Sequence, residues 1–177
     1  MLPVVLDVDG VLAEFTEALL RFAGREPRSS GRQPTWGFPE FSNEEWAALW
    51  ERMEREPDFW LTPERIPSWA EVAELNALAR HTRIVYATSR PKYARAQTER
   101  WLRICDFPVG GVLVTKAKPR RIAGRIGPIA GMLDDSPAIV EEALAAKLPI
   151  TVRDWPYNRH VVAPRVYSLG EFIGGLM

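Results

Sequence analysis

The chain has only one cysteine and two histidines among its 177 residues. Cys105 has no second cysteine with which to form an internal disulfide, so a reducing compartment is expected. His81 and His160 are too few and too far apart in the chain for a zinc site. Acidic and basic residues are equal in number, 23 of each, which indicates no general attraction to the nucleic-acid backbone or to an anionic membrane.

Long apolar runs are also missing from the sequence. No stretch reaches the roughly 20 apolar residues that a membrane-spanning helix needs. Only Met1 and Leu2 precede the first expected strand, which leaves no room for a signal peptide, so we expect a cytoplasmic enzyme. Hydrophobic residues make up 46% of the chain and charged residues 26%, a composition typical of a packed globular domain.

Short apolar runs recur along the chain and alternate with helical patterns. The runs lie at 4–6, 83–87, 111–114, 129–133 and 149–152, and the helical patterns include 68–81, 93–105 and 137–147. Buried strands that alternate with helices are typical of an α/β fold. The sequence therefore predicts a Rossmann-like parallel sheet with helices on both faces.

The stretch from Gly24 to Pro67 breaks this rhythm and carries four of the seven tryptophans. Such an insertion lies above the strand ends, where an open α/β sheet binds its ligand. We therefore expect a small helical cap at 24–67, inserted after the first strand, and an α/β core formed by 1–23 and 68–177. Trp46 and Trp50 share one helical stripe, which favours packing inside the cap.

Side chains suited to phosphate chemistry follow four of the predicted strands. They are Asp7 and Asp9, then Thr88 and Ser89, then Lys116, and finally Asp134 and Asp135. Because the carboxyl ends of parallel strands meet at one edge of a sheet, all four groups are expected to converge. Like charges at the mouth of an apolar core are costly unless a divalent cation and an anionic substrate use them. The sequence therefore predicts a magnesium-dependent phosphatase.

These four segments resemble the motifs of the haloacid dehalogenase (HAD) superfamily, the first of them reading Asp7-Val8-Asp9-Gly10-Val11. The resemblance implies that Asp7 is the nucleophile that forms an aspartyl-phosphate. It also implies that Asp9 protonates the leaving oxygen and then activates water. A second acid at this place argues against a dehalogenase, because a halide needs no proton to leave.

The resemblance also implies roles for the later segments. Thr88 is expected to hydrogen-bond the phosphoryl group, and Lys116 to hold the nucleophile and the phosphate together. Mg²⁺ is expected to bind Asp7, Asp134 and the backbone carbonyl of Asp9, with Asp135 as a further ligand or as a support for the others. Mg²⁺ is the only cofactor that the sequence implies.

The flanks of the motifs are similar to those of the 5′(3′)-deoxyribonucleotidases, a family of cytosolic type C nucleotidases. The likeness rests on the continuation of the first motif to Phe15, on the loop Trp36-Gly37-Phe38 and on Thr88-Ser89-Arg90-Pro91-Lys92. It implies that Phe15, Trp36 and Phe38 sandwich a nucleobase and that Ser89, Lys92 and Lys116 contact the substrate near its phosphate. Packing alone is the alternative role for Phe15 in its helix and for Trp36 and Phe38 in the cap. Three departures are Gly37, which separates two aromatic residues that are adjacent in the family, Arg90, where the family has proline, and Ser136, where it has arginine.

The expected substrate is a (deoxy)nucleoside monophosphate, with base, sugar and phosphate position left open. A phosphatase of the same superfamily for polynucleotide ends or a sugar phosphate is an alternative, and so is a catalytically idle binding module. A strand of nucleic acid needs a basic channel. Residues that could line one are Arg25, Arg28, Arg32, Lys116, Lys118, Arg120 and Arg121. No membrane partner is expected, and a homodimer is left open.

Overall fold

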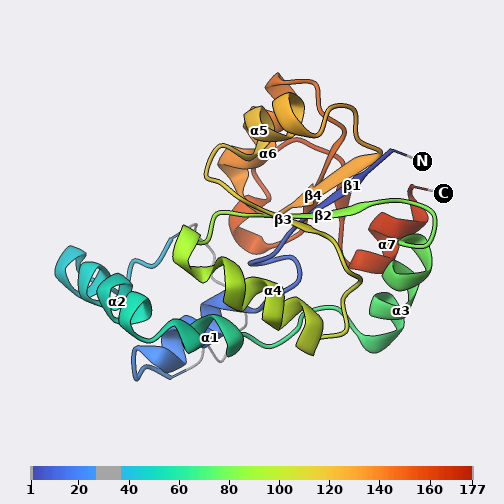
Figure 1. Cartoon of the computed structure of the whole chain (residues 1–177). Coiled ribbons are helices and arrows are strands. Elements are labelled where there is room, and N and C mark those ends of the chain that lie inside the picture. The colour runs from blue at the N-terminus through green and yellow to red at the C-terminus, as the bar shows by residue number, and fades with distance from the viewer. Residues whose placement is uncertain (1, 27–36, 177) are drawn as a thin grey trace.

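The computed structural model describes residues 2–26 and 37–176 of the chain. At its centre is a parallel sheet of six strands in the order β3-β2-β1-β4-β5-β6 (Figure 1). The strands are β1 (Val4–Asp7), β2 (Ile84–Thr88), β3 (Gly111–Val114), β4 (Gly131–Asp134), β5 (Ile150–Arg153) and β6 (Arg165–Val166). The predicted α/β fold with a parallel sheet is confirmed. The predicted run at 111–114 matches β3, the ends of the other four runs differ from β1, β2, β4 and β5 by at most two residues, and the short strand β6 was not predicted.

The helices follow or separate these strands. They are α1 (Phe15–Phe22), α2 (Asn43–Arg55), α3 (Trp69–Leu78), α4 (Arg95–Ile104), α5 (Lys118–Arg125), α6 (Pro137–Ala145) and α7 (Leu169–Gly174), with short 3₁₀ helices η1 (Pro57–Leu61), η2 (Lys92–Ala94) and η3 (Pro156–Asn158). Ser42 and Ser68 cap α2 and α3 through capping boxes, as their sequences indicate. The apolar pattern does not predict α5, whose buried residues include a lysine, Lys118.

Successive residues of β1 face opposite sides of the sheet, and both sides are buried. Val4 and Leu6 pack in one apolar cluster with residues of α3, α4 and α7. Val5 packs in a second cluster with residues of α5 and α6. Helices therefore cover both faces, as predicted, and the all-apolar character of β1 follows from burial on both sides (Figure 1).

A third apolar cluster lies apart from the sheet and joins α1, α2 and η1 (Figure 1). Ala18 and Leu19 of α1 pack there with Met53 of α2 and with Phe59 and Trp60 of η1. The helix α1, expected in the core segment 1–23, thus packs with the inserted helices. Its apolar stripe begins and ends with an aromatic residue, Phe15 and Phe22. The rings of both residues pack against Phe59 of η1.

The order in which the chain adds strands to the sheet reverses beside β1. From β1 it passes to β2 and β3 on one side, and it returns to β4 on the other side of β1. In open α/β sheets the crevice beside such a change in strand order is the usual ligand site. Asp7 ends β1 and Asp134 ends β4, so both carboxylates lie at this place. Within the part of the chain that the structure describes, no helix is long and apolar enough to cross a membrane.

Candidate active site

Three carboxylates meet at the carboxyl ends of β1 and β4. Asp7, Asp134 and Asp135 are at most 4% exposed, and each places an oxygen within 4.8 Å of the oxygens of the other two. Burying one unpaired carboxylate is already costly, and three together repel one another. Such a group is stable only with positive charge beside it, and buried carboxylate oxygens are ligands that hard divalent cations prefer.

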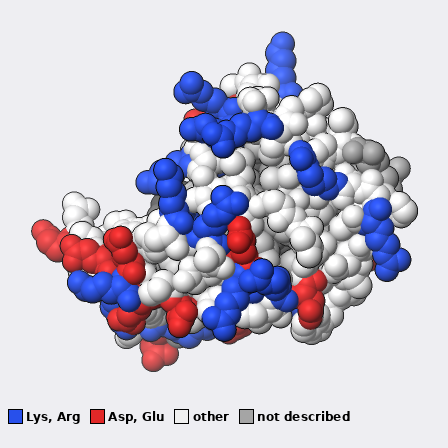
Figure 2. Space-filling model, viewed as in Figure 1, with Lys and Arg blue, Asp and Glu red and all other residues white. Residues whose placement is uncertain are grey.

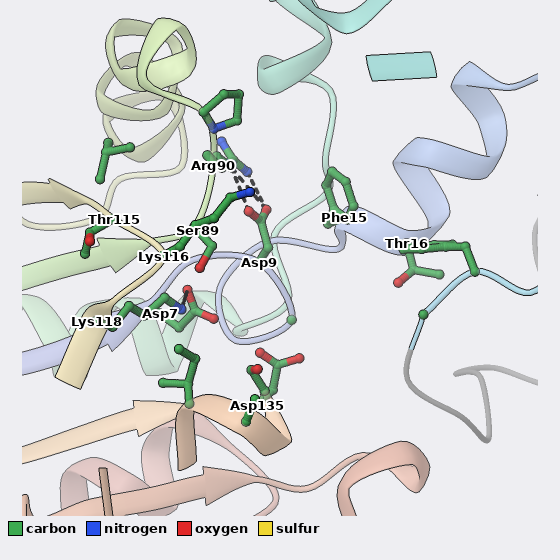
Figure 3. A pocket seen from close by; sticks show the side chains of 18 of the residues that line it. Asp7, Asp9, Phe15, Thr16, Ser89, Arg90, Thr115, Lys116, Lys118 and Asp135 are labelled. Atoms are coloured by element: carbon green, nitrogen blue, oxygen red, sulfur yellow. Dashed lines mark hydrogen bonds and ion pairs between the residues drawn. The ribbon is translucent and has the colours of Figure 1, made fainter. Parts of the chain in front are cut away.

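Part of that positive charge comes from Lys118 at the start of α5. Its Nζ lies 2.7 Å from Oδ1 of Asp7 and 2.8 Å from Oδ2 of Asp134 (Figure 3). Burial by itself lowers the pKa of Lys118, but the charges of Asp134 and Asp7 outweigh it and leave this pKa raised. The ammonium group is therefore permanently charged. One such charge against three carboxylates leaves room for a divalent cation.

The pKa values of the carboxylates reflect this crowding. Burial, and after it the charge of Asp134, raises the pKa of Asp7 well above its ordinary value, although Lys118 acts in the opposite direction. Burial and Asp134 raise the pKa of Asp135 to about 6. Perturbed carboxylates in a cleft are typical of functional sites. A bound cation would offset the repulsion among these carboxylates and favour the ionised forms of Asp7 and Asp135.

The position expected for Lys116 is held by Lys118, two residues further along. Lys116 is exposed in the loop before α5 and lines the cavity described below, but no ion pair joins it to a described carboxylate. The physical reason is the start of α5, which turns Lys118 back toward the strand ends. Proline at the second position of α5 is a favoured helix start, and Pro119 was the signal in the sequence for this placement.

Asp9 lies apart from the other three carboxylates and is paired with Arg90. Nε of Arg90 lies 2.9 Å from Oδ2 of Asp9, and Nη2 lies 2.7 Å from Oδ1 (Figure 3). The side chain of Arg90 is only 1% exposed, whereas that of Asp9 is 24% exposed. The carboxylate of Asp9 is not one of those grouped for a metal ion among the described residues. Its side chain therefore serves a separate purpose, and the site includes an arginine that sequence reasoning noted only as a departure.

The same guanidinium group reaches two other elements. Its Nη1 donates to the backbone carbonyl of Trp60 in η1 at 3.3 Å and to Oγ1 of Thr98 in α4 at 3.2 Å. Arg90 thus connects Asp9 to α4, which packs on the sheet, and to η1 of the inserted segment. Such a buried charge with good partners fixes the position of the carboxylate that it holds.

The two hydroxyl residues at the end of β2 also differ in position. Thr88 is fully buried, and its Oγ1 accepts a hydrogen bond from the backbone N–H of Arg90 at 3.1 Å. Ser89 lines the cavity. Of the two residues expected to contact the phosphoryl group, Ser89 therefore faces the open space, while Thr88 shapes the turn that carries Arg90.

A cavity of about 980 Å³ opens above these groups. Its polar floor includes Asp7, Asp9, Lys118 and Asp135, and Lys92 and Lys116 also line it. Its apolar wall is aromatic and consists of Phe15, Phe38, Trp46, Trp50 and Trp60. Trp46 and Trp50 thus line the cavity, in addition to the packing inside the cap that their spacing favours. Trp36, expected beside Phe38, lies outside the described residues.

The aromatic wall is built by stacking. The rings of Phe15 and Trp60 stack with centroids 5.9 Å apart, and Phe38 stacks on Trp46 at 5.1 Å. Both pairs therefore hold their rings in defined orientations. Phe15 and Phe38, the two described members of the expected base sandwich, lie against each other edge to face at 6.2 Å.

Gly10 lets the loop after β1 pass directly over Asp135. Its φ of +84° is a conformation that side chains disfavour, and a Cβ atom there would lie 2.1 Å from the Asp135 carboxylate. Any other residue at position 10 is thus incompatible with the carboxylate group as it stands.

Comparison with known proteins agrees with this geometry. The model of one protein family, described as "5′ nucleotidase, deoxy (Pyrimidine), cytosolic type C protein", matches residues 1–173. A comparison with curated proteins finds no match.

Among solved structures, similar folds come from HAD hydrolases. A haloacid dehalogenase-like hydrolase from Streptococcus pneumoniae is 11% identical, with a TM-score of 0.66 over 100% of this chain and 99% of the other. A Bacillus subtilis protein described as a HAD hydrolase, YfnB, bound to magnesium, is 14% identical, with a TM-score of 0.65 over 98% and 97%. CbbY from Rhodobacter sphaeroides in complex with phosphate is 20% identical, with a TM-score of 0.58 over 97% and 96%. At these identities the likeness establishes the HAD-like fold.

Proposed function

Since the chain belongs to the family of deoxy (pyrimidine) cytosolic type C 5′-nucleotidases, which makes it a phosphatase of the HAD type, we propose that it dephosphorylates (deoxy)nucleoside monophosphates. The proposed reaction depends on Mg²⁺ and passes through an aspartyl-phosphate on Asp7. One observation carries the proposal. Asp7, Lys118 and Asp135 lie on the floor of a cavity whose wall is aromatic, and Asp134 is buried beneath them in contact with Lys118. The family is described as cytosolic, which supports the proposed cytoplasmic location.

The residues present fit a magnesium ion. Asp7, Asp134 and Asp135 offer three hard oxygen ligands from a buried position, and their charge exceeds that of Lys118 by two. When bound, Mg²⁺ supplies the positive charge that lets a carboxylate approach a dianionic phosphate. Magnesium in the related YfnB structure is consistent with this assignment.

Asp7 and Asp9 divide the chemistry in the proposed reaction. An Asp7 oxygen bonds to phosphorus while the bond from phosphorus to the ester oxygen breaks, and that oxygen takes its proton from Asp9. Water then gives a proton to Asp9 and attacks phosphorus, which releases inorganic phosphate and restores Asp7. The contact of Lys118 with Asp7 supports its role in holding the nucleophile, and the pairing with Arg90 supports a fixed position for Asp9.

The inserted helices with α1 act as the proposed cap, a role expected for 24–67. Phe15, Phe38, Trp46, Trp50 and Trp60 come from these segments and line the cavity opposite the carboxylates. A nucleobase has two flat faces that aromatic rings can stack on. Ser89 and Lys92 line the cavity from the other side and are proposed to contact the phosphate end of the substrate.

Replacing Phe38 with alanine is expected to lower kcat/KM for nucleoside monophosphates by roughly tenfold, since loss of one stacking ring weakens base binding. Hydrolysis of glycerol phosphate, which has no ring, is expected to change little. Phe41→Ala is the matched control, because Phe41 packs on Phe38 but is not among the described residues that line the cavity. Equal losses on both substrates in Phe38→Ala, measured as released phosphate, contradict the stacking role.

Metal binding is expected to stabilise the protein more at high pH than at low pH. Burial raises the pKa of Asp135 to about 6 and also raises that of Asp7. Raised values mean that the metal-free fold tolerates the protonated acids and loses stability as the pH rises through this range, whereas a cation needs the ionised form. The rise in Tm on adding Mg²⁺ should therefore be large at about pH 8 and small at about pH 5. A rise in Tm that is independent of pH contradicts the assigned ligands.

The function itself is tested by a substrate screen with released phosphate as the readout. Deoxy- and ribonucleoside 5′- and 3′-monophosphates, sugar phosphates and a 3′-phosphorylated oligonucleotide are compared with Mg²⁺ and with a chelator. We expect mononucleotides to react fastest and the chelator to abolish turnover. Faster hydrolysis of a sugar phosphate than of any nucleotide overturns the substrate assignment but leaves the phosphatase in place.

The described surface gives mixed support to a polynucleotide substrate, because Lys116, Arg120 and Arg121 are exposed but the other candidates are buried, paired or outside the described residues. Of the residues considered for a strand channel, Lys118 is buried against carboxylates and Arg25 pairs with Glu45 at 2.8 Å. Arg28 and Arg32 lie outside the described residues. On the face shown in Figure 2, basic side chains are spread over several places, and acidic ones gather over α2. A mononucleotide is therefore the proposed substrate, and a homodimer stays a prediction.

A further inference from the structure

The segment that follows β5 makes contacts with both sides of the carboxylate group. Trp155, Tyr157 and Asn158 belong to this segment, which ends in the short helix η3. The indole Nε1 of Trp155 donates to the backbone carbonyl of Gly10 at 2.7 Å. The amide Nδ2 of Asn158 donates to the backbone carbonyl of Asp135 at 2.9 Å. Residues 155–158, here called the brace, thus join the loop after β1 to the end of β4.

The side chain of Tyr157 touches the proposed metal-binding carboxylate itself. Its hydroxyl donates a hydrogen bond to Oδ2 of Asp135. Lys118 contacts Asp7 and Asp134, and no ion pair joins Asp135 to a described basic residue. Asp135 is therefore oriented by Tyr157, by the neighbouring carboxyl group of Asp7, by the close approach of Gly10 and by its own backbone contact with Asn158.

Two residues of the brace are buried, and hydrogen bonds hold its end in place. Tyr157 is 5% exposed and Asn158 is fully buried. Nη1 of Arg165 donates to Oδ1 of Asn158 at 2.8 Å and to Oδ1 of the buried Asp154 at 3.0 Å. A hydrogen-bond donor can orient a metal ligand only if it is held in place, and this network holds it.

We propose that Tyr157 is a positioning residue that holds Asp135 in the orientation needed for the divalent cation, with the brace as its support. This inference rests on the proposed function, because the cation is part of it. Partners that orient a ligating carboxylate typically change metal affinity by about 10- to 100-fold when they are removed. Tyr157→Phe removes the hydroxyl group and keeps the ring.

The test is isothermal titration calorimetry of the full chain with Mn²⁺ and with Mg²⁺. Tyr157→Phe is expected to weaken metal binding by about tenfold or more. In activity assays it should raise the Mg²⁺ concentration for half-maximal rate by the same factor, while kcat at saturating Mg²⁺ stays close to that of the unmodified protein. Tyr167→Phe is the matched control, since Tyr167 is 63% exposed and is not part of the brace. The Kd of this variant for the metal should not change.

The outcomes separate this inference from the proposed function. Unchanged metal affinity in Tyr157→Phe, with binding intact in the unmodified protein, overturns the positioning role and leaves the phosphatase proposal standing. An equal loss of Tm with and without metal, at unchanged Kd, shows a purely structural role and overturns it as well. Absence of metal binding by the unmodified protein overturns both. If Tyr157→Phe does not fold, Trp155→Phe removes the donor to Gly10, and unchanged affinity there overturns the brace.

Discussion

Replacing Asp7 with asparagine is expected to reduce phosphate release by at least about 10⁴-fold, because an amide cannot accept the phosphoryl group and no neighbouring group can take its place. The fold should remain intact. Burial and the charge of Asp134 disfavour the ionised form of Asp7, so a neutral amide of the same shape costs the metal-free protein little. The measurement is released phosphate with the best nucleotide, together with thermal unfolding.

Beryllium fluoride gives an independent readout of the same residue. It mimics a phosphoryl group on a carboxylate, so it should inhibit the unmodified protein and raise its Tm when Mg²⁺ is present. Neither effect is expected with Asp7→Asn. Substantial residual turnover in this variant, or protection of the variant by beryllium fluoride, contradicts a covalent intermediate on Asp7.

The second large effect is expected at Lys118. Lys118→Met should lower kcat by about 10² to 10³-fold, the usual cost of removing one group that stabilises charge in the transition state. Lys116→Met is the matched comparison. It removes the same charge from a side chain that is exposed and has no described carboxylate partner, and it should cost less than about tenfold.

Stability must be measured beside activity in this comparison. Removing one partner of a buried ion pair typically costs about 3–5 kcal/mol, because the other charge is left uncompensated. Lys118→Met should therefore unfold at lower temperature without metal, and Mg²⁺ should recover part of the loss. If Lys116→Met loses more activity than Lys118→Met, the cation at Asp7 in the working enzyme is Lys116, as the sequence alone suggested.

The sequence was sufficient for the groups that lie at strand ends. Asp7 and Asp134 could be placed because apolar runs mark β1 and β4, and parallel strands bring their carboxyl ends to one edge. The same rule led to Lys116, since it is the first lysine after β3. It could not show that α5 begins at Lys118 and directs that residue inward, because Ile122 and Pro119 are the only apolar residues that this short helix buries.

Other parts of the site depend on contacts between distant segments. Arg90 reaches Asp9 across 81 positions of the chain, and Trp155 reaches Gly10 across 145. Asp9 and Gly10 belong to a recognisable motif, but local sequence carries no signal for the partners Arg90 and Trp155 that reach them from distant segments. Only packing reveals that Arg90 is buried and must therefore be paired.

The aromatic wall and the carboxylate floor of the cavity come from different parts of the fold. The groups proposed to make and break bonds are fixed by the sheet, whereas the rings opposite them belong to α1, α2, η1 and the loop before α2. Under the proposed function, exchanging rings on that wall is expected to change substrate selectivity and to leave the bond-making and bond-breaking groups unchanged. A library of variants at Phe38, Trp46 and Trp50 can be screened on phosphate esters with different leaving groups, and every charged side chain of the site is kept.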